Sequence, residues 1–210
     1  MLTPQAPLGG LVTVPATAIA DAGWLGAQLV LAARRFRVDA RTAGVLWWYS
    51  GSSVLLGPPA SSFVEGGRVA TPSLGSMTLS VHPDGRVLDA RSADSVPRGE
   101  ASALVGELVA TCAGAVAAAS GAPVRSLWAI ASDSLANRVL WAGGGQGEAA
   151  ALAADGRFPR PRFVEVAGQR VVRRSSCCLV YESPGEQKCV SCPRQRPDDR
   201  LRRLKAALGG

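Results

Sequence analysis

The cysteines of this chain are unevenly placed. Four of the five fall within sixteen residues near the C-terminus, whereas Cys112 stands alone on an apolar helical stripe and is expected in the core. The 210-residue chain has one histidine, His82, which directly precedes a Pro-Asp-Gly sequence and is expected to belong to that turn. Sites that need two or three imidazoles are therefore excluded. Any metal chemistry must use sulfur.

The four clustered cysteines follow the spacing Cys-Cys-x10-Cys-x2-Cys. Two are adjacent, ten residues separate the second from the third, and two residues separate the third from the fourth. Cys189 and Cys192 have the spacing of a zinc knuckle, but Cys177 and Cys178 have no spacer. Adjacent side chains diverge in an extended strand, so the use of both requires a locally turned backbone. A binuclear cluster accepts ligands over a larger volume than a single ion does, so it suits adjacent cysteines better. The spacing thus favours an iron–sulfur cluster over structural zinc, although zinc remains an alternative. It also favours a cluster over disulfides or structurally inert thiols.

The redox compartment bears on these thiols. The first 33 residues contain no lysine or arginine, so the basic start of a secretory signal is missing. Residues 22–33 and 101–119 are apolar, but the first stretch is too short to span a membrane and the second is rich in alanine and interrupted by Glu107. We interpret both as core helices. We therefore expect a cytoplasmic protein with no transmembrane segment. In the cytoplasm, clustered thiols more often bind metal or take part in redox reactions than form disulfides.

The excess of basic charge surrounds the cysteines. Residues 161–210 contain 11 lysines and arginines against 5 acidic residues, whereas residues 1–160 contain 12 against 11. An iron–sulfur cluster with four thiolates is anionic, so nearby cations are expected to balance it, or to attract an anionic ligand or an acidic protein. Five basic residues bracket the thiols: Arg173, Arg174, Lys188, Arg194 and Arg196.

Hydrophobic periodicity predicts an α+β fold. Apolar residues recur at helical spacing after Asp21, a candidate N-cap, and again within residues 43–56, 104–116 and 128–139. Residues 69–90 alternate with period two around a Pro-Asp-Gly turn, which predicts an antiparallel β-hairpin. The helices ending near residues 56 and 139 are expected to stop at the Gly-Pro-Pro and Gly-Gly-Gly sequences that follow them.

Residue patterns also predict the secondary structure of the C-terminal part. Residues 163–172 are typical of a strand or short hairpin, and Pro197 opens a last helix with acidic residues in its first turn. The cysteines lie between these two elements. We therefore expect a helical domain with an antiparallel hairpin or sheet over residues 1–160, and a cysteine-rich, cluster-binding module over residues 161–210.

Two groups of side chains carry further expectations. Trp47 and Trp48 are adjacent and cannot point to the same side of a helix, so one of them is expected to be exposed, while most other tryptophans are expected in the core. Asp133, Asn137 and Arg138 lie on the polar side of their helix. A solvated helix face is favoured for these three over contact with a substrate.

The residues around the cysteines carry a resemblance. The run Arg-Arg-Ser-Ser-Cys-Cys-Leu-Val-Tyr at 173–181, then Pro-Gly at 184–185, then Cys-Val-Ser-Cys-Pro at 189–193, resembles the C-terminal signature of the FhuF-type ferric-siderophore reductases. Spacing, terminal position and the preceding basic pair agree together. Residues 126–136 are more weakly similar, and the first 100 residues carry no recognisable motif. The resemblance implies a [2Fe-2S] cluster whose ligands are Cys177, Cys178, Cys189 and Cys192, and reduction of ferric siderophores in the cytoplasm.

This resemblance implies an oxidoreductase in which residues 1–160 bind the ferric siderophore and the C-terminal module passes one electron to its iron, with no catalytic residue beyond the cluster. All-thiolate ligation keeps the reduction potential low. The chain has no Walker or Rossmann motif, so a separate electron-donor protein, a ferredoxin or a reductase, is expected. No nucleic acid partner is expected. Two alternatives remain: a zinc-stabilised binding protein whose basic tail holds an acidic partner or nucleic acid, and a ferredoxin-like electron carrier without a siderophore site.

Overall fold

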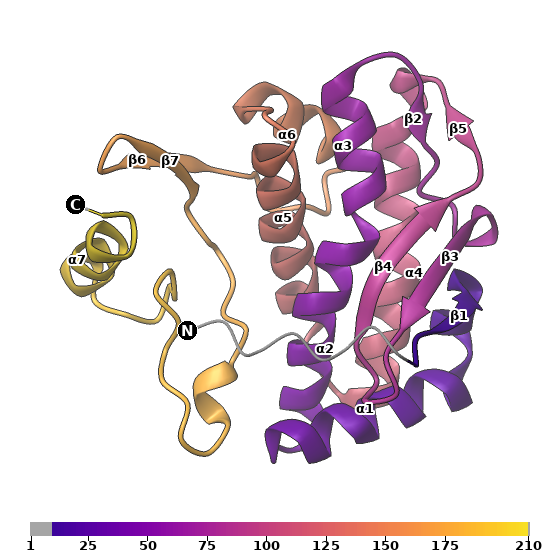
Figure 1. Ribbon diagram of the computed structural model, residues 1–210, viewed down its shortest axis with the longest axis horizontal. Helices are drawn as coiled ribbons and strands as arrows, with labels where there is room; N and C mark the ends of the chain where they lie inside the picture. Colours follow the sequence, from indigo (N-terminus) through magenta and orange to yellow (C-terminus); the bar gives the residue numbers. More distant parts are fainter. Residues whose placement is uncertain (1–9, 210) are drawn as a thin grey trace.

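The computed structural model describes residues 10–209 and has the predicted α+β architecture (Figure 1). Its α-helices are α1 (Ala22–Phe36), α2 (Ala40–Leu55), α3 (Gly57–Glu65), α4 (Ala101–Ser120), α5 (Val124–Trp141), α6 (Gln146–Leu152) and α7 (Pro197–Ala207). Its strands are β1 (Val12–Pro15), β2 (Val69–Ala70), β3 (Met77–Val81), β4 (Val87–Ser92), β5 (Ser95–Val96), β6 (Phe163–Val166) and β7 (Gln169–Val172). The strands form small antiparallel sheets of order β1-β3-β4, β2-β5 and β6-β7.

Helix α2 lies at the centre of a body made of α1 to α6 and the β1-β3-β4 sheet (Figure 1). It packs against α1, α4, α5 and β4. The indole of Trp48 donates a hydrogen bond to the Leu127 carbonyl of α5 at 2.8 Å, and that of Trp47 donates to the Gly85 carbonyl in the β3–β4 turn at 3.0 Å. These two indoles tie the central helix to both neighbouring layers.

The prediction that either Trp47 or Trp48 is exposed is wrong. Their side chains are only 3% and 1% exposed, respectively. Adjacent helical side chains do point in directions about 100° apart, but α2 has neighbours on more than one side, so both indoles are covered. The exposed tryptophan is Trp141, at the C-terminal end of α5, which is 67% accessible to solvent.

The predicted helices are confirmed, and the helix breakers between them also begin new helices. Asp21 caps α1 by accepting a hydrogen bond from the Trp24 amide at 2.6 Å. The Gly57-Pro58 pair ends α2 but opens α3, because proline is well suited to the first turn of a helix. Likewise the glycines at 143–145 end α5 and are followed at once by α6. Neither short helix was predicted.

The predicted hairpin is confirmed as β3 and β4. His82 belongs to its turn, as expected, since its amide donates to the Arg86 carbonyl at 2.9 Å. Strand β1 pairs with β3 and adds a third strand that the local pattern did not predict, with Val12 opposite Val81.

Helix α4 is the most apolar segment of the described chain. Residues Arg98–Ser120 are long and apolar enough to cross a membrane by length and composition, with a mean hydropathy of 1.6. One face of α4 is nevertheless packed inside the body, where Val105, Val109 and Cys112 are fully buried. This helix is therefore a core helix, as is α1, whose Leu25 is also buried.

The C-terminal part lies beside the body rather than in its core (Figure 1). Strands β6 and β7 form a hairpin with Phe163 opposite Val172, and α7 lies next to it with no buried residue. The buried members of the main apolar cluster end at Phe158. Between β7 and α7, the cysteine segment runs past α5 and α2.

Candidate functional site

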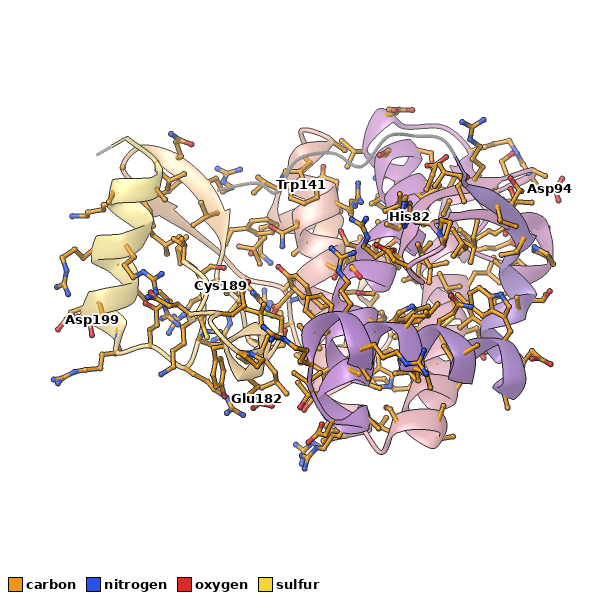
Figure 2. The ribbon with its side chains drawn as sticks, turned by 60° about the horizontal axis from the view of Figure 1, so that its bottom comes forward. His82, Asp94, Trp141, Glu182, Cys189 and Asp199 are labelled. Atoms are coloured by element: carbon orange, nitrogen blue, oxygen red, sulfur yellow. The ribbon has the colours of Figure 1, made fainter. Side chains whose placement is uncertain are left out.

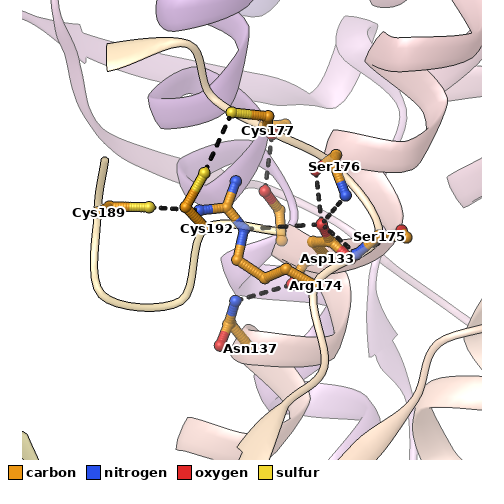
Figure 3. A network of polar contacts seen from close by, with 10 residues as sticks. Asp133, Asn137, Arg174, Ser175, Ser176, Cys177, Cys189 and Cys192 are labelled. Carbon is orange, nitrogen blue, oxygen red and sulfur yellow. Dashed lines mark hydrogen bonds and ion pairs between the residues drawn. The ribbon is translucent and has the colours of Figure 1, made fainter. Parts of the chain in front are cut away.

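The clustered cysteines meet between the C-terminal part and the helical body, where Figure 2 labels Cys189 and Figure 3 labels Cys177, Cys189 and Cys192. Their sulfurs form two pairs. The Sγ atoms of Cys177 and Cys192 lie 3.5 Å apart, and the thiol of Cys189 is hydrogen-bonded to that of Cys178. All five cysteines are free, so the disulfide alternative is not what the structure shows. Cys112 is fully buried in the body, as predicted.

Two local turns aim these thiols. Leu179, directly after the Cys177–Cys178 pair, has φ of 63°, in the left-handed region, and the chain then enters a short 3-10 helix at Val180–Glu182. This is the turned backbone that two adjacent ligands were expected to require. In the other half, the Cys192 amide donates to the Cys189 carbonyl at 3.0 Å, which closes a turn that presents both thiols on one side.

Asp133 of α5 anchors the cysteine segment to the body (Figure 3). Its carboxylate accepts hydrogen bonds from the amides and hydroxyls of both Ser175 and Ser176, at 2.5 to 3.1 Å. Asp133 is only 5% exposed, so the prediction that it lies on a solvated face is wrong. A buried carboxylate is stable there because the chain just before Cys177 supplies its donors. Sequence reasoning missed this role, although Asp133 lies within the weakly similar stretch 126–136.

Helix α7 holds the Cys189–Cys192 turn from the other side. The Gln195 side chain donates to the carbonyls of Cys189 and Val190 at 2.8 and 3.0 Å. Arg203 of α7 donates in turn to the Gln195 side chain and to the Lys188 carbonyl, both at 2.9 Å. These contacts give the exposed C-terminal helix a structural role, which is to fix the backbone that carries two of the thiols.

Arg174 is the cation closest to the thiols. Its Nη1 lies 3.4 Å from the Cys189 sulfur, its guanidinium stacks over the ring of Tyr49 at 4.7 Å, and its Nε is 3.7 Å from the Asp133 carboxylate. Burial alone lowers the pKa of Arg174, but the anionic forms of Tyr49, Cys178, Cys189 and Asp133 outweigh burial and raise it. Arg174 is therefore a permanent buried positive charge beside the sulfurs.

The thiols differ in acidity. The hydrogen bond from the Cys189 thiol, opposed by burial, lowers the pKa of Cys178 to about 5, and the same hydrogen bond raises the pKa of Cys189. Burial raises the pKa of Cys177 to about 11. At neutral pH Cys178 is therefore a thiolate, the form that binds metals, and it lies next to the Arg174 charge.

The comparison with protein families bears on this segment alone. Residues 174–194 match the family model of the FhuF 2Fe-2S C-terminal domain. The cysteine segment is of the FhuF 2Fe-2S type. Its cofactor is a [2Fe-2S] cluster, and the chain is an iron–sulfur redox protein. The match spans a tenth of the chain and leaves the helical body unassigned. No curated protein matches the sequence.

The residues of this FhuF-type segment fit such a cluster. A tetrahedral metal with metal–sulfur bonds of about 2.3 Å holds two of its sulfurs about 3.8 Å apart, close to the 3.5 Å between the Cys177 and Cys192 sulfurs. Two thiol pairs suit two iron ions. The Arg174 Nε and Nη2 atoms are buried and have no hydrogen-bond partner within residues 10–209. A negatively charged cluster bound at the thiols would place a counter-charge near these unpaired donors. No three metal-ligating side chains of the described residues surround one ion position.

The other basic residues around the cysteines, Arg173, Lys188 and Arg194, make no hydrogen bond to a sulfur within residues 10–209. Arg173 is exposed and lines a groove between the β6-β7 hairpin and α7. Lys188 is exposed and donates to the Arg194 carbonyl at 3.1 Å. Arg194 donates to the Tyr181 hydroxyl at 2.6 Å and lines a cavity next to Cys177. Adjacent positions 173 and 174 both line this groove but differ in burial, since Arg173 is exposed and Arg174 is buried, which the sequence does not reveal.

Two cavities reach the thiols. One, of about 400 Å³, lies between the N-terminal ends of α2 and α5 and the cysteine segment, and Cys177 lines it. The other, of about 270 Å³, is apolar, contains Trp47 and Tyr49, and reaches Cys178 and Cys189. The cluster position is therefore accessible to small molecules from two sides.

Proposed function

We propose that this protein is a ferric-siderophore reductase. It transfers one electron to ferric iron held by a siderophore, and the ferrous product is released because hard oxygen chelators hold the lower-charged ion less tightly. The observation that carries this proposal is the FhuF 2Fe-2S match at residues 174–194, together with four thiols gathered in two pairs beside a cavity.

The proposed ligands of the [2Fe-2S] cluster are Cys177, Cys178, Cys189 and Cys192. When bound, such a cluster accepts and passes on one electron, and all-thiolate ligation keeps its potential low. Arg174 balances the negative charge that the thiolates bring into a buried site, and Asp133 holds the ligand-bearing chain in place. The proposed reaction needs no nucleophile or general base, because it makes and breaks no covalent bond of the siderophore.

The electron comes from a donor protein, a ferredoxin or a reductase, in the cytoplasm. We propose that residues 1–160 form the substrate-binding domain and residues 161–210 the cluster module. The substrate is the iron chelate and not a nucleotide, since no nucleotide motif is present in the sequence.

Anaerobic purification followed by iron and zinc quantification tests the cofactor. We expect two irons per chain and visible absorption that dithionite bleaches. Serine variants of Cys177, Cys178, Cys189 and Cys192 are expected to lose the cluster, whereas the matched control Cys112→Ser keeps it, because Cys112 is buried in the body away from the site. A colourless protein with one zinc per chain contradicts the proposal.

A second assay tests the reaction. Protein reduced with dithionite and freed of excess reductant is mixed with ferric siderophores, and ferrous iron is trapped with a coloured ferrous chelator. We expect one ferrous ion per reduced cluster. If the cluster is present and reducible but no ferric chelate is reduced, the protein is an electron carrier instead.

A further inference from the structure

The cavity beside Cys177 has three arginines and no carboxylate in its lining. Arg41 comes from the first turn of α2, Arg125 from the first turn of α5, and Arg194 from the cysteine segment. Arg41 and Arg125 form no ion pair with any residue between 10 and 209, and Arg194 donates only to the Tyr181 hydroxyl. Three guanidinium groups thus border one concave space without a bound counter-charge.

The backbone adds to this positive character. Arg41 and Arg125 are each the second residue of a long helix, so the N-terminal ends of α2 and α5 both border the cavity. A helix N-terminus carries a partial positive charge and unpaired amide groups. The N-cap of α2 is filled by Asp39, but that of α5 is Pro123, which offers no side chain to the first-turn amides. The α5 terminus is therefore open to an anion.

The carboxylates near the cavity are engaged by other groups, as Asp133 is by its Ser175 and Ser176 donors and by Arg174. The Asp39 side chain is used by the Thr42 amide, and the Glu182 side chain accepts from the Thr42 hydroxyl at 2.7 Å. Hydrogen bonds from Thr42 and, to a lesser extent, the Arg41 charge lower the pKa of Asp39. None of these carboxylates is part of the cavity lining.

The cavity on the other side of the thiols provides an internal comparison. It also contains two arginines, Arg35 and Arg86, but both are paired with Asp84, and the remaining lining is dominated by apolar and aromatic side chains such as Phe36. Its two arginines share one carboxylate, whereas no carboxylate lines the Cys177 cavity. Of the two routes to the sulfurs, only the Cys177 route is built to receive negative charge.

We propose that the cavity lined by Arg41, Arg125 and Arg194 binds a compact, oxygen-ligated ferric chelate of net negative charge, which receives its electron through the Cys177 side of the site. Arginines recognise carboxylate and related oxygen pairs with two parallel hydrogen bonds. A volume of about 400 Å³ suits a small molecule, whereas an acidic donor protein needs a broad surface. This inference rests on the proposed function and assigns it a substrate class and a site.

Redox-inert gallium chelates test binding apart from electron transfer. The probes are gallium tris(oxalate), a trianion, and gallium tris(acetohydroxamate), which is neutral and similarly sized. Calorimetry on the cluster-loaded protein is expected to show that the trianion binds at least tenfold more tightly. The double variant Arg41→Gln/Arg125→Gln is expected to weaken trianion binding about tenfold or more and to leave binding of the neutral probe unchanged.

A matched control removes two charges elsewhere. Arg91→Gln/Arg202→Gln changes exposed arginines on β4 and α7, each paired with an aspartate, and is expected to bind both probes as the parent does. Visible spectra report whether each variant keeps its cluster. Equal binding of both probes to the parent overturns the proposal, as does unchanged trianion binding in the cavity variant.

Kinetics separate this inference from the proposed function. With ferric tris(oxalate) as acceptor, the cavity variant is expected to raise KM about tenfold while kcat stays near the parent value. If the parent reduces no ferric chelate, the proposed reaction fails, yet the gallium data still decide the binding site. If the variant binds the gallium trianion normally but loses reduction by an acidic donor protein, the cavity is a docking site for that donor and the inference is wrong.

Discussion

Arg173 and Arg174 are neighbours in sequence that differ in burial. Arg173 is exposed, whereas Arg174 is buried 3.4 Å from the Cys189 sulfur. A buried positive charge stabilises the reduced, more negative state of a nearby redox centre far more than a solvated charge does. We expect Arg174→Gln to lower the reduction potential by roughly 60 mV, the equivalent of about 1.4 kcal/mol for one electron.

The matched control for this prediction is Arg173→Gln, which removes the same charge one residue away. Spectroelectrochemical titration of both variants measures the difference. A shift of similar size in both variants indicates that only net charge matters and contradicts a specific role for the buried guanidinium.

Asp133 carries the connection between the cysteine segment and the body. Asp133→Asn keeps the shape but removes the charge that the Ser175 and Ser176 donors and Arg174 share. Removing one partner of a buried charged network costs about 3 kcal/mol. We expect hydrogen exchange at the Ser175 and Ser176 amides to accelerate by about 100-fold.

Asp89→Asn provides the control for that measurement, because the Asp89 side chain is half-exposed and is paired with Arg91 on the same strand. It is expected to change exchange at these amides by less than a factor of two, as surface pairs contribute little. Unchanged protection in Asp133→Asn refutes the anchoring role.

At the scale of elements, the crossing of α2 and α4 depends on a glycine. A Cβ atom at Gly44 would lie 2.2 Å from the Ser120 Oγ and 2.6 Å from its Cβ. Alanine normally stabilises a helix by about 1 kcal/mol relative to glycine. At this position the steric overlap with Ser120 outweighs that gain, so the substitution is destabilising. We expect Gly44→Ala to lower the free energy of unfolding by about 1 to 3 kcal/mol.

Gly114 of α4 is the comparison for this helix pair. It is exposed, and an added Cβ meets nothing within 4 Å. Gly114→Ala is therefore expected to raise the free energy of unfolding by up to about 1 kcal/mol. Urea unfolding followed by circular dichroism measures both variants. Equal effects of the two substitutions contradict the close crossing.

For the whole molecule, the body and the C-terminal part differ in how they are stabilised. The main cluster of buried apolar residues lies within residues 16–158, whereas α7 has no buried residue. A chain of residues 1–160 is therefore expected to unfold cooperatively and to keep the near-ultraviolet signal of its five tryptophans. Residues 161–210 alone are expected to lack cooperative unfolding in the absence of metal. A fragment 1–160 that binds hydrophobic dyes and lacks that tryptophan signal contradicts this division of stability.

The predictable features of this protein are those with a local cause. The cysteine spacing indicated the kind of cofactor, because each pair of thiols is placed by its own short turn. The helical and strand periods indicated α1, α2, α4, α5, α7 and the β3–β4 hairpin, because one apolar face of each element packs on the body or a neighbouring element. Short segments such as α3, α6 and β1 carry too few residues for such a period.

The remaining features depend on contacts between distant residues, and only the tertiary structure decides them. Whether Asp133 faces water or the Ser175-Ser176 chain depends on where the C-terminal segment crosses α5, 42 residues later in sequence. The burial of both Trp47 and Trp48 depends on neighbours on several sides of α2. By itself the sequence determined the sulfur chemistry and the longer elements. The tertiary structure decided which charges surround the sulfurs, since the electrostatics of a site are set by distance and burial, not by order along the chain.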